Sequence, residues 1–225
     1  MQLKNRYLAF LFVIVLVYAA ACTPAQPPAT AAPASSDAKP SPQQQADVPP
    51  TAQKQEISAE VKELFDKSKT RVRSIYYKYR GPETGSNFYE FYVKGDKIKY
   101  KPYLEIKSLD RPDSYDAVFV DKTASTAQSY CTAAYCAYKG KKEDLSYASA
   151  YLPTVFDWIG GLDKASKVGE EVIDSRSTWK IDTNKGVLWI DTFYGIPLKA
   201  ESGGKTYRYE QISVNSVEDP DVTPP

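Results

Sequence analysis

The small number of cysteines and the lack of histidine limit the chemistry that this protein can perform. The chain has three cysteines, Cys22, Cys131 and Cys136, and it contains no histidine. The lack of histidine excludes Ser–His and Cys–His nucleophile systems and histidine-ligated metals. Cys131 and Cys136 alone are too few for a cysteine-ligated zinc or iron–sulfur site. We therefore expect no cofactor, and we expect the cysteines to serve structure or attachment.

The spacing of Cys131 and Cys136 predicts a disulfide that closes a turn. In a straight strand their Cα atoms would lie about 16 Å apart, whereas a disulfide allows only about 4.4–6.8 Å. A helix would place them on different faces. The chain must therefore turn within residues 132–135, and we expect two strands joined there and clipped by the bond. Such a small loop contributes about 2 kcal/mol.

The N-terminus has the pattern of an export signal. Lys4 and Arg6 precede an uncharged, apolar stretch, residues 7–21. As a helix this stretch would span about 22 Å, less than the roughly 30 Å of hydrocarbon in a bilayer. Length and flanking charge therefore favour a secretory signal peptide over residues 1–21.

The end of this stretch, Ala19-Ala20-Ala21-Cys22, resembles the lipobox of bacterial and archaeal lipoproteins. In that family the cysteine thiol receives a lipid and the signal is cut just before it; Ala19 stands where the family usually has leucine. The resemblance implies a lipid on Cys22 that holds the chain to the outer face of the cytoplasmic membrane or to an outer membrane. Ordinary cleavage after Ala21 and an uncleaved anchor are the alternatives.

Composition divides the rest of the chain into a tether, a domain and a tail. Residues 22–55 are rich in Pro, Ala and Gln with no apolar periodicity, which predicts a disordered tether behind the lipidated cysteine. Residues 56–218 are long enough for one domain, and 219–225 read as a polar tail. Net charge is +1 with no basic run, so we expect no nucleic-acid partner.

Within residues 56–218 the apolar periodicity changes from helical to extended. Residues 57–67 have helical spacing with Ser58 as a cap, and Pro153 opens a second short helix with an apolar side. Elsewhere residues alternate, as where Ile75, Tyr77 and Tyr79 share one face of a strand. Short turns separate about eight or more such strands, which predicts antiparallel pairing. We therefore expect an α+β fold with one long antiparallel sheet.

The C-terminal strands have a recognisable order of motifs. Trp179-Lys-Ile-Asp182, Leu188-Trp-Ile-Asp-Thr192 and Gly195-Ile-Pro-Leu-Lys199, followed by the strand 207–215, resemble the outer-membrane lipoprotein-sorting families. These are a periplasmic lipoprotein carrier and its lipid-anchored acceptor. The resemblance implies an open half-barrel, with helices covering its concave face and an acyl chain in the apolar cavity between. The Cys131/Cys136 hairpin departs from the family pattern.

From this resemblance and the aromatic strand faces we expect a non-enzymatic, extracytoplasmic lipoprotein that binds an acyl chain, an amphiphile or a lipoprotein. The candidate cavity residues are large apolar side chains on strands and on the second helix: Tyr77, Tyr79, Phe88, Tyr92, Phe156, Trp158, Trp179, Ile181 and Trp189. Packing in a hydrophobic core would also explain why these positions have large apolar side chains, without any ligand.

Two other functions fit the sequence. One is a surface spacer or interaction lipoprotein with no small ligand, which an exposed edge strand or apolar patch would favour. The other is a polysaccharide-acting enzyme, because two carboxylates cleave glycosides without histidine. Its candidate carboxylates are Glu90, Asp182 and Asp191. We favour solvent-facing or ion-paired roles for these three.

Overall fold

The computed structural model describes residues 56–104 and 109–225, which belong to one compact unit of the chain. The predicted signal peptide, the lipid on Cys22 and the tether up to residue 55 lie outside the described residues. In the part of the chain that is described, no helix has the length and hydropathy to cross a bilayer.

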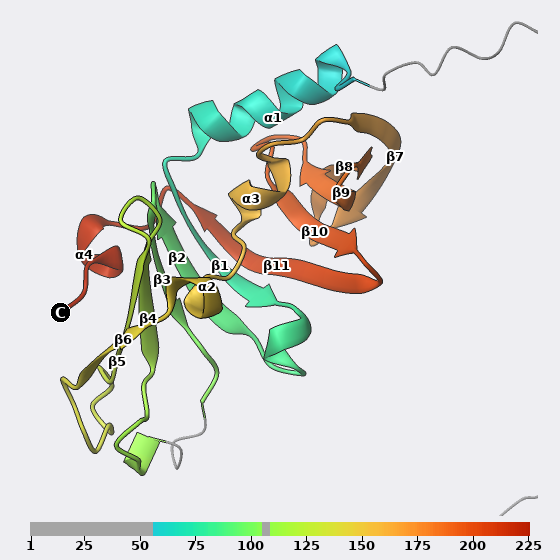
Figure 1. Cartoon of the computed structure of the whole chain (residues 1–225). Coiled ribbons are helices and arrows are strands. Elements are labelled where there is room, and N and C mark those ends of the chain that lie inside the picture. The colour runs from blue at the N-terminus through green and yellow to red at the C-terminus, as the bar shows by residue number, and fades with distance from the viewer. Residues whose placement is uncertain (1–55, 105–108) are drawn as a thin grey trace, which may run out of the picture. The chain divides into compact units, whose positions relative to one another are not determined.

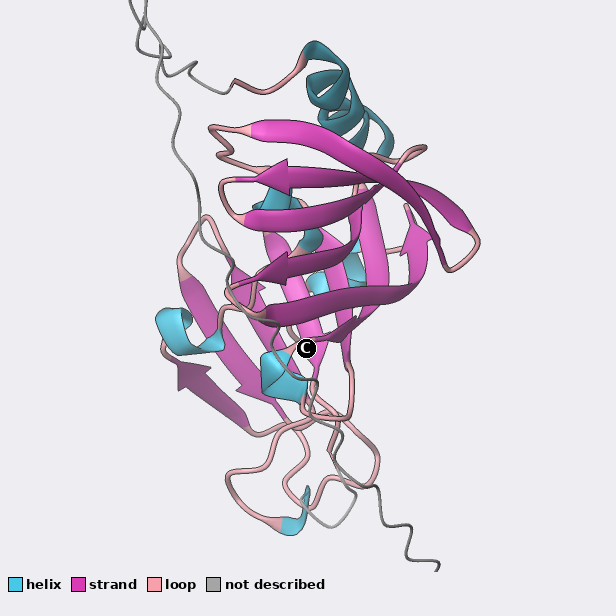
Figure 2. Cartoon of the chain, turned by 90° about the vertical axis from the view of Figure 1, so that its right-hand side faces the viewer, coloured by secondary structure: helices cyan, strands magenta, loops and turns pink. Residues whose placement is uncertain are grey.

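The fold is mostly β: one open, curved antiparallel sheet of eleven strands (Figures 1 and 2). The strands are β1 (Ser74–Arg80), β2 (Tyr89–Lys94), β3 (Lys97–Lys101), β4 (Ala117–Asp121), β5 (Thr126–Tyr130), β6 (Lys142–Leu145), β7 (Ala165–Ile173), β8 (Arg176–Thr183), β9 (Gly186–Asp191), β10 (Pro197–Ser202) and β11 (Lys205–Val214). Their order across the sheet is β6-β5-β4-β3-β2-β1-β11-β10-β9-β8-β7. The predicted long antiparallel sheet with short helices is thus confirmed.

Most of the helices cover one face of this sheet, as expected, and the last one packs against the opposite face, where its Asp219 pairs with Lys94. The helices are α1 (Ala59–Arg71), η1 (Pro82–Thr84), α2 (Tyr147–Ala150), α3 (Val155–Ile159) and α4 (Asp219–Val222). Helix α1 crosses the end of the sheet near β7, while α2 lies over β4 and β5 and α3 lies over β10 (Figure 1). We call residues 146–162, which include α2 and α3, the lid. Helix α4 packs against β2 and β3, so the end of the chain contacts the sheet where we expected a polar tail.

Aromatic side chains fill the space between the lid and the sheet. Ile75, Tyr77 and Tyr79 alternate along β1 and are fully buried on the covered face, as the alternation predicts. Phe91 stacks on Tyr77 with ring centroids 5.2 Å apart, and Tyr209 meets the same ring edge-on at 5.3 Å. These rings belong to one continuous core that extends from α1 to the sheet and the lid. Residues 56–225 therefore contain the core they need to fold.

Helix α1 is held against the turn between β9 and β10. Gly195 has a φ of +70°, and a Cβ added there would lie 2.1 Å from the carbonyl oxygen of Leu64. Only glycine permits both that conformation and that approach. Lys67 and Arg71 donate hydrogen bonds to the carbonyls of Thr192 and Phe193 in the same turn. These contacts extend the helix beyond residue 67, where the sequence pattern ends.

The disulfide joins Cys131 and Cys136 with Cα atoms 5.9 Å apart. Its position differs from the expected hairpin clip, because Cys131 directly follows β5 whereas Cys136 lies well before β6. The hairpin closes instead through backbone bonds between Cys131 and the pair Gly140 and Lys141. The bond therefore closes a smaller loop within the hairpin connection.

Candidate functional site

The clearest concave apolar surface lies between α1 and the end of the lid, and we call it the α1–α3 groove. It has a volume of about 350 Å³. Its apolar walls come from both elements: Ile57, Phe65, Phe156, Ile159 and Leu162. Gly160 and Gly161 form part of the same wall without side chains, so the lid backbone borders the groove directly. Apart from Phe65, these apolar residues are only partly buried, as expected for walls rather than core.

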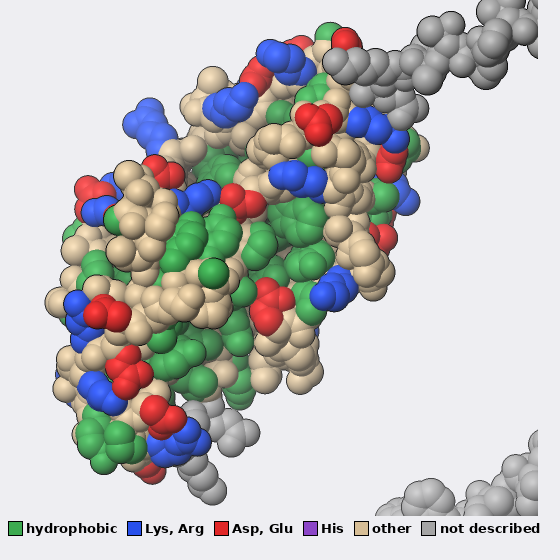
Figure 3. All heavy atoms as spheres, viewed as in Figure 1, with side chains coloured by type: hydrophobic (Ala, Val, Ile, Leu, Met, Phe, Trp, Pro, Cys, Tyr) green, Lys and Arg blue, Asp and Glu red, His purple; other side chains and the backbone are tan. Residues whose placement is uncertain are grey.

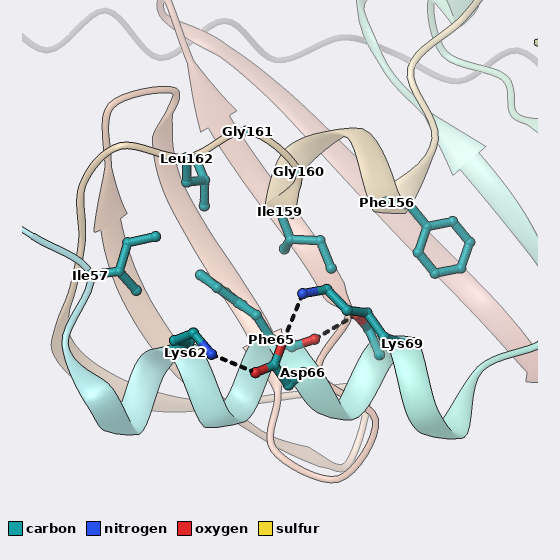
Figure 4. Close-up of a pocket in the computed structure, with 11 residues that line it drawn as sticks. Ile57, Lys62, Phe65, Asp66, Lys69, Phe156, Ile159, Gly160, Gly161 and Leu162 are labelled. Atoms are coloured by element: carbon teal, nitrogen blue, oxygen red, sulfur yellow. Dashed lines mark hydrogen bonds and ion pairs between the residues drawn. The ribbon is translucent and has the colours of Figure 1, made fainter.

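Figure 4 shows how these side chains lie. Ile57, Ile159 and Leu162 point toward the space beside α1, and Phe65 projects from the helix between them. The rim is charged: Asp66 accepts hydrogen bonds from Lys62 at 3.2 Å and from Lys69 at 2.7 Å. An apolar interior with a polar rim is the usual composition of a small-molecule site.

A second pocket of about 290 Å³ adjoins the groove, and we call it the Arg73 pocket. Ser68, Lys69 and Phe156 line both cavities, so the two are neighbours that share part of their walls. The remaining lining is more polar and includes Arg73 and Lys122. The combined site is thus apolar at one end and cationic at the other.

One carboxylate fixes the lid above this site. Asp157 in α3 accepts hydrogen bonds from Tyr151 at 2.6 Å, from the backbone and hydroxyl of Thr154, and from Lys122 at 3.0 Å. Burial alone would raise the pKa of the Asp157 carboxyl, but these hydrogen bonds outweigh it and hold the pKa below its usual value. Lys185 also donates to the Asp157 carbonyl at 2.7 Å. Residues from two sheet turns therefore anchor α3.

The structure gathers five of the candidate cavity residues on the covered side of the sheet. Tyr77, Tyr79 and Ile181 are fully buried there, and Trp179 is half-buried against the same core. Trp158 reaches down from the lid and donates its indole N–H to Tyr209. These residues pack against one another, so within the described chain they act as core. A sixth candidate, Phe156, lines both cavities.

The other three candidates, Phe88, Tyr92 and Trp189, lie on the opposite face. Register places Tyr92 between Tyr76 and Lys99, away from the buried alternate positions of β2. Lys78 lies 4.3 Å from the Phe88 ring centroid, and Lys199 lies 4.0 Å from that of Trp189. The structure therefore does not bring these three to the cavity.

The three candidate catalytic carboxylates each have local partners. Glu90 accepts hydrogen bonds from two tyrosine hydroxyls, those of Tyr76 and Tyr92. Asp182 is paired with Lys164 at 2.9 Å. Asp191 is buried, accepts the backbone N–H groups of the following turn, and lies 3.4 Å from an Arg176 nitrogen. Each of these arrangements serves the fold.

Among the described residues, Asp116, Cys131 and Cys136 bring their ligand-type atoms within 4.8 Å of one another. The two sulfurs are bonded to each other, which removes the thiolates that a metal would need. The Asp116 carboxylate accepts hydrogen bonds from both the backbone N–H and the hydroxyl of Thr132. This group stabilises the loop and does not fit a metal site.

Sequence reasoning missed most of the groove. Ile57, Phe65 and Ile159 stood out only as apolar positions of two helices, and Leu162 and Arg73 were not singled out. The available signal was Ile57 itself, an apolar residue one position before the predicted N-cap, because such a residue packs outside the helix proper.

The site thus belongs to an open antiparallel sheet with a lid and a surface apolar groove. No known family model matches the chain, and no curated protein matches it in sequence. Three solved structures have a similar fold at low identity. The lipoprotein LppX of Mycobacterium tuberculosis is 16% identical, with a TM-score of 0.43, over 73% of this chain and 97% of that one.

The second is the MucA/MucB complex of Pseudomonas aeruginosa, at 13% identity and a TM-score of 0.42 over 74% of this chain. There the match covers 62% of the other chain, so this chain spans less than two thirds of its length. The third is LprF of Mycobacterium bovis, 14% identical with a TM-score of 0.39, over 76% of this chain and 98% of that one. All three are distant likenesses in fold.

Proposed function

We propose that this chain is an exported, lipid-anchored, non-enzymatic protein whose α1–α3 groove binds the acyl chain of a lipid or lipoprotein. The observation that carries the proposal is the apolar interior of the groove. Partly exposed Ile57, Ile159 and Leu162 face one another across it. Contiguous apolar surface that no described residue covers is unfavourable in water and marks a binding surface.

An acyl chain fits this surface better than a flat or rigid ligand. The groove is bounded by α1 and the lid, and together with the Arg73 pocket it gives a path along α1 from Ile57 to Arg73. Seen from outside, hydrophobic side chains gather in the hollowed middle of this face, over α2 and α3 (Figure 3). A flexible apolar chain fills such a path without requiring many polar partners.

The placement of the ligand differs from the sequence-based expectation. There the acyl chain lay between sheet and lid, where Tyr77, Tyr79 and Tyr209 now fill the space. In our proposal the chain lies beside α1, and Phe156 is the one candidate residue that touches it. The anchor on Cys22 and export of the chain are part of the proposal and rest on the sequence.

Ile159→Glu tests the groove directly. A carboxylate in the apolar wall costs several kilocalories per mole when an acyl chain excludes water from it. We expect residues 56–225, purified without denaturant, to carry lipid detectable by mass spectrometry and to bind a fluorescent fatty acid. The variant should lose both, whereas the control Val172→Glu, on the exposed edge strand β7, should keep both.

A spacer or interaction role is the alternative. It would gain support if the folded wild-type domain carried no lipid and took up no fatty acid. In both variants thermal melting must show a folded protein, because Ile159 also packs against the core.

A further inference from the structure

Arg73 is the charged residue beside the site that has no assigned structural role. It lies two residues after the end of α1 and lines the Arg73 pocket with an exposed side chain. Its backbone N–H donates to Asn215 at 2.7 Å. Among the residues that the structure describes, no hydrogen bond or ion pair engages its guanidinium. A guanidinium offers a fork of donors suited to two oxygens of one anion.

Two of the neighbouring cations are already paired with carboxylates. Lys69 pairs with Asp66 and Lys122 pairs with Asp157. The pocket's own carboxylate, Asp96, accepts a hydrogen bond from Thr123 at 2.9 Å. The two linings contain four cations, Lys62, Lys69, Arg73 and Lys122, against two carboxylates, Asp66 and Asp96. Counting Asp157 beside them, the site has one positive charge in excess. A neutral ligand would leave this charge unmatched.

The unpartnered guanidinium of Arg73 lies at one end of the two adjoining cavities. Because Ser68, Lys69 and Phe156 line both cavities, a ligand whose chain occupies the α1–α3 groove would place its head beside Arg73. We propose that the ligand is an amphiphile with an anionic head, a phosphate, carboxylate or sulfate, held by Arg73 while its chain lies in the groove. This inference rests on the proposed acyl-chain function and adds the chemistry and orientation of the ligand.

Three ligands separate the contributions of chain and head: dodecyl phosphate, dodecanol and inorganic phosphate, each titrated calorimetrically into residues 56–225. We expect dodecyl phosphate to bind about tenfold tighter than dodecanol, the effect of one charge-assisted pair of hydrogen bonds. Inorganic phosphate, a head without a chain, should bind far more weakly than either. Raising the salt concentration should narrow the difference between the two alkyl ligands.

Arg73→Gln should remove the preference for dodecyl phosphate and leave dodecanol binding unchanged. The matched control is Arg208→Gln, an exposed arginine on β11 that lines neither cavity; it should keep the preference. Arg73 is exposed, so its replacement should not affect folding.

The outcomes distinguish this inference from the proposed function. If both alkyl ligands bind equally and Arg73→Gln changes neither, the anionic head is excluded while the acyl groove stands. If inorganic phosphate binds as tightly as dodecyl phosphate, the pocket is a free-anion site and the inference fails. If neither alkyl ligand binds, the proposed function fails and this inference fails with it.

Discussion

Tyr77 places a hydroxyl group in the middle of the core, where no described residue forms a hydrogen bond of normal geometry with it. Burial raises the pKa of this hydroxyl well above its usual range, and the nearby Val155 backbone offsets the effect only in part. Tyr209, equally buried, has a partner, because its oxygen accepts the indole N–H of Trp158. The two tyrosines therefore differ in what their hydroxyls contribute.

Tyr77→Phe should leave stability unchanged or raise it by up to about 1 kcal/mol, because it removes an unpaired buried polar group. Tyr209→Phe should lower the free energy of unfolding by about 1–2 kcal/mol, because it leaves the Trp158 N–H unpaired. Urea unfolding of both variants measures the difference. An equal loss in both would mean that the Tyr77 hydroxyl is satisfied after all.

At the scale of single residues, the sequence predicts burial well, but it does not predict whether a buried side chain forms part of the core or of a binding site. Alternation along β1 correctly placed Ile75, Tyr77 and Tyr79 on one face. Alternation also separates Trp189 from Leu188 and Ile190, as the structure does, although all three are buried. Charged stems cover Trp189 on the outer face, so burial there does not indicate the covered side.

The side chain of Asp157 fixes the lid, and its protonation state affects the stability of the fold. Because the pKa of Asp157 is lower in the folded protein, its ionised form stabilises the fold at pH values above the unfolded pKa. That stabilisation is lost as the pH falls through the folded value, so the relevant window lies below about pH 4. Between neutral pH and pH 5 the contribution should be constant.

Asp157→Asn should therefore lower the free energy of unfolding at neutral pH and flatten its decline in acid. Chemical denaturation at a series of pH values measures both effects. Asp113→Asn is the control: its carboxyl also has a lowered pKa, through a hydrogen bond from Arg111, but the pair is exposed and should matter little. A wild-type-like acid profile in Asp157→Asn would exclude this role.

The sequence predicts the types of the elements, but it does not predict which residues hold them in place. Pro153 and the apolar spacing after it predict α3. The residues that hold it in place, Lys122 and Lys185, lie in turns far away along the chain. The sequence around a lysine in a turn does not indicate which residue the lysine will contact. The α1–α3 groove was missed for the same reason, since it exists only between two helices that the sheet brings together.

For the molecule as a whole, the order of the strands is informative. Strands β1 to β6 form one meander of sequential neighbours and β7 to β11 form another. The meanders join where β1 pairs with β11, for example at Ile75 and Val214. Short turns predict each meander, but either edge of one could have joined the other, and nothing local in the sequence selects between them.

This topology predicts that the chain tolerates a cut in the lid. Gly160 and Gly161 are exposed and lie between the meanders, and exposed small-residue segments accept breaks best. Separately expressed residues 56–160 and 161–225 should reassociate through the β1–β11 pairing. Co-elution in gel filtration with a native-like circular dichroism spectrum would show this; two pieces that stay apart would show that the covalent link is needed.

The close approach of Gly195 to Leu64 has a further consequence for how such a protein diverges over generations. The position of α1 depends on a turn that lines neither cavity. A substitution at Gly195 would push α1 away from this turn and change the shape of the α1–α3 groove, while every residue in its wall kept its identity. The ligand preference of descendants of this chain could thus change through substitutions that a comparison of the wall residues alone would overlook.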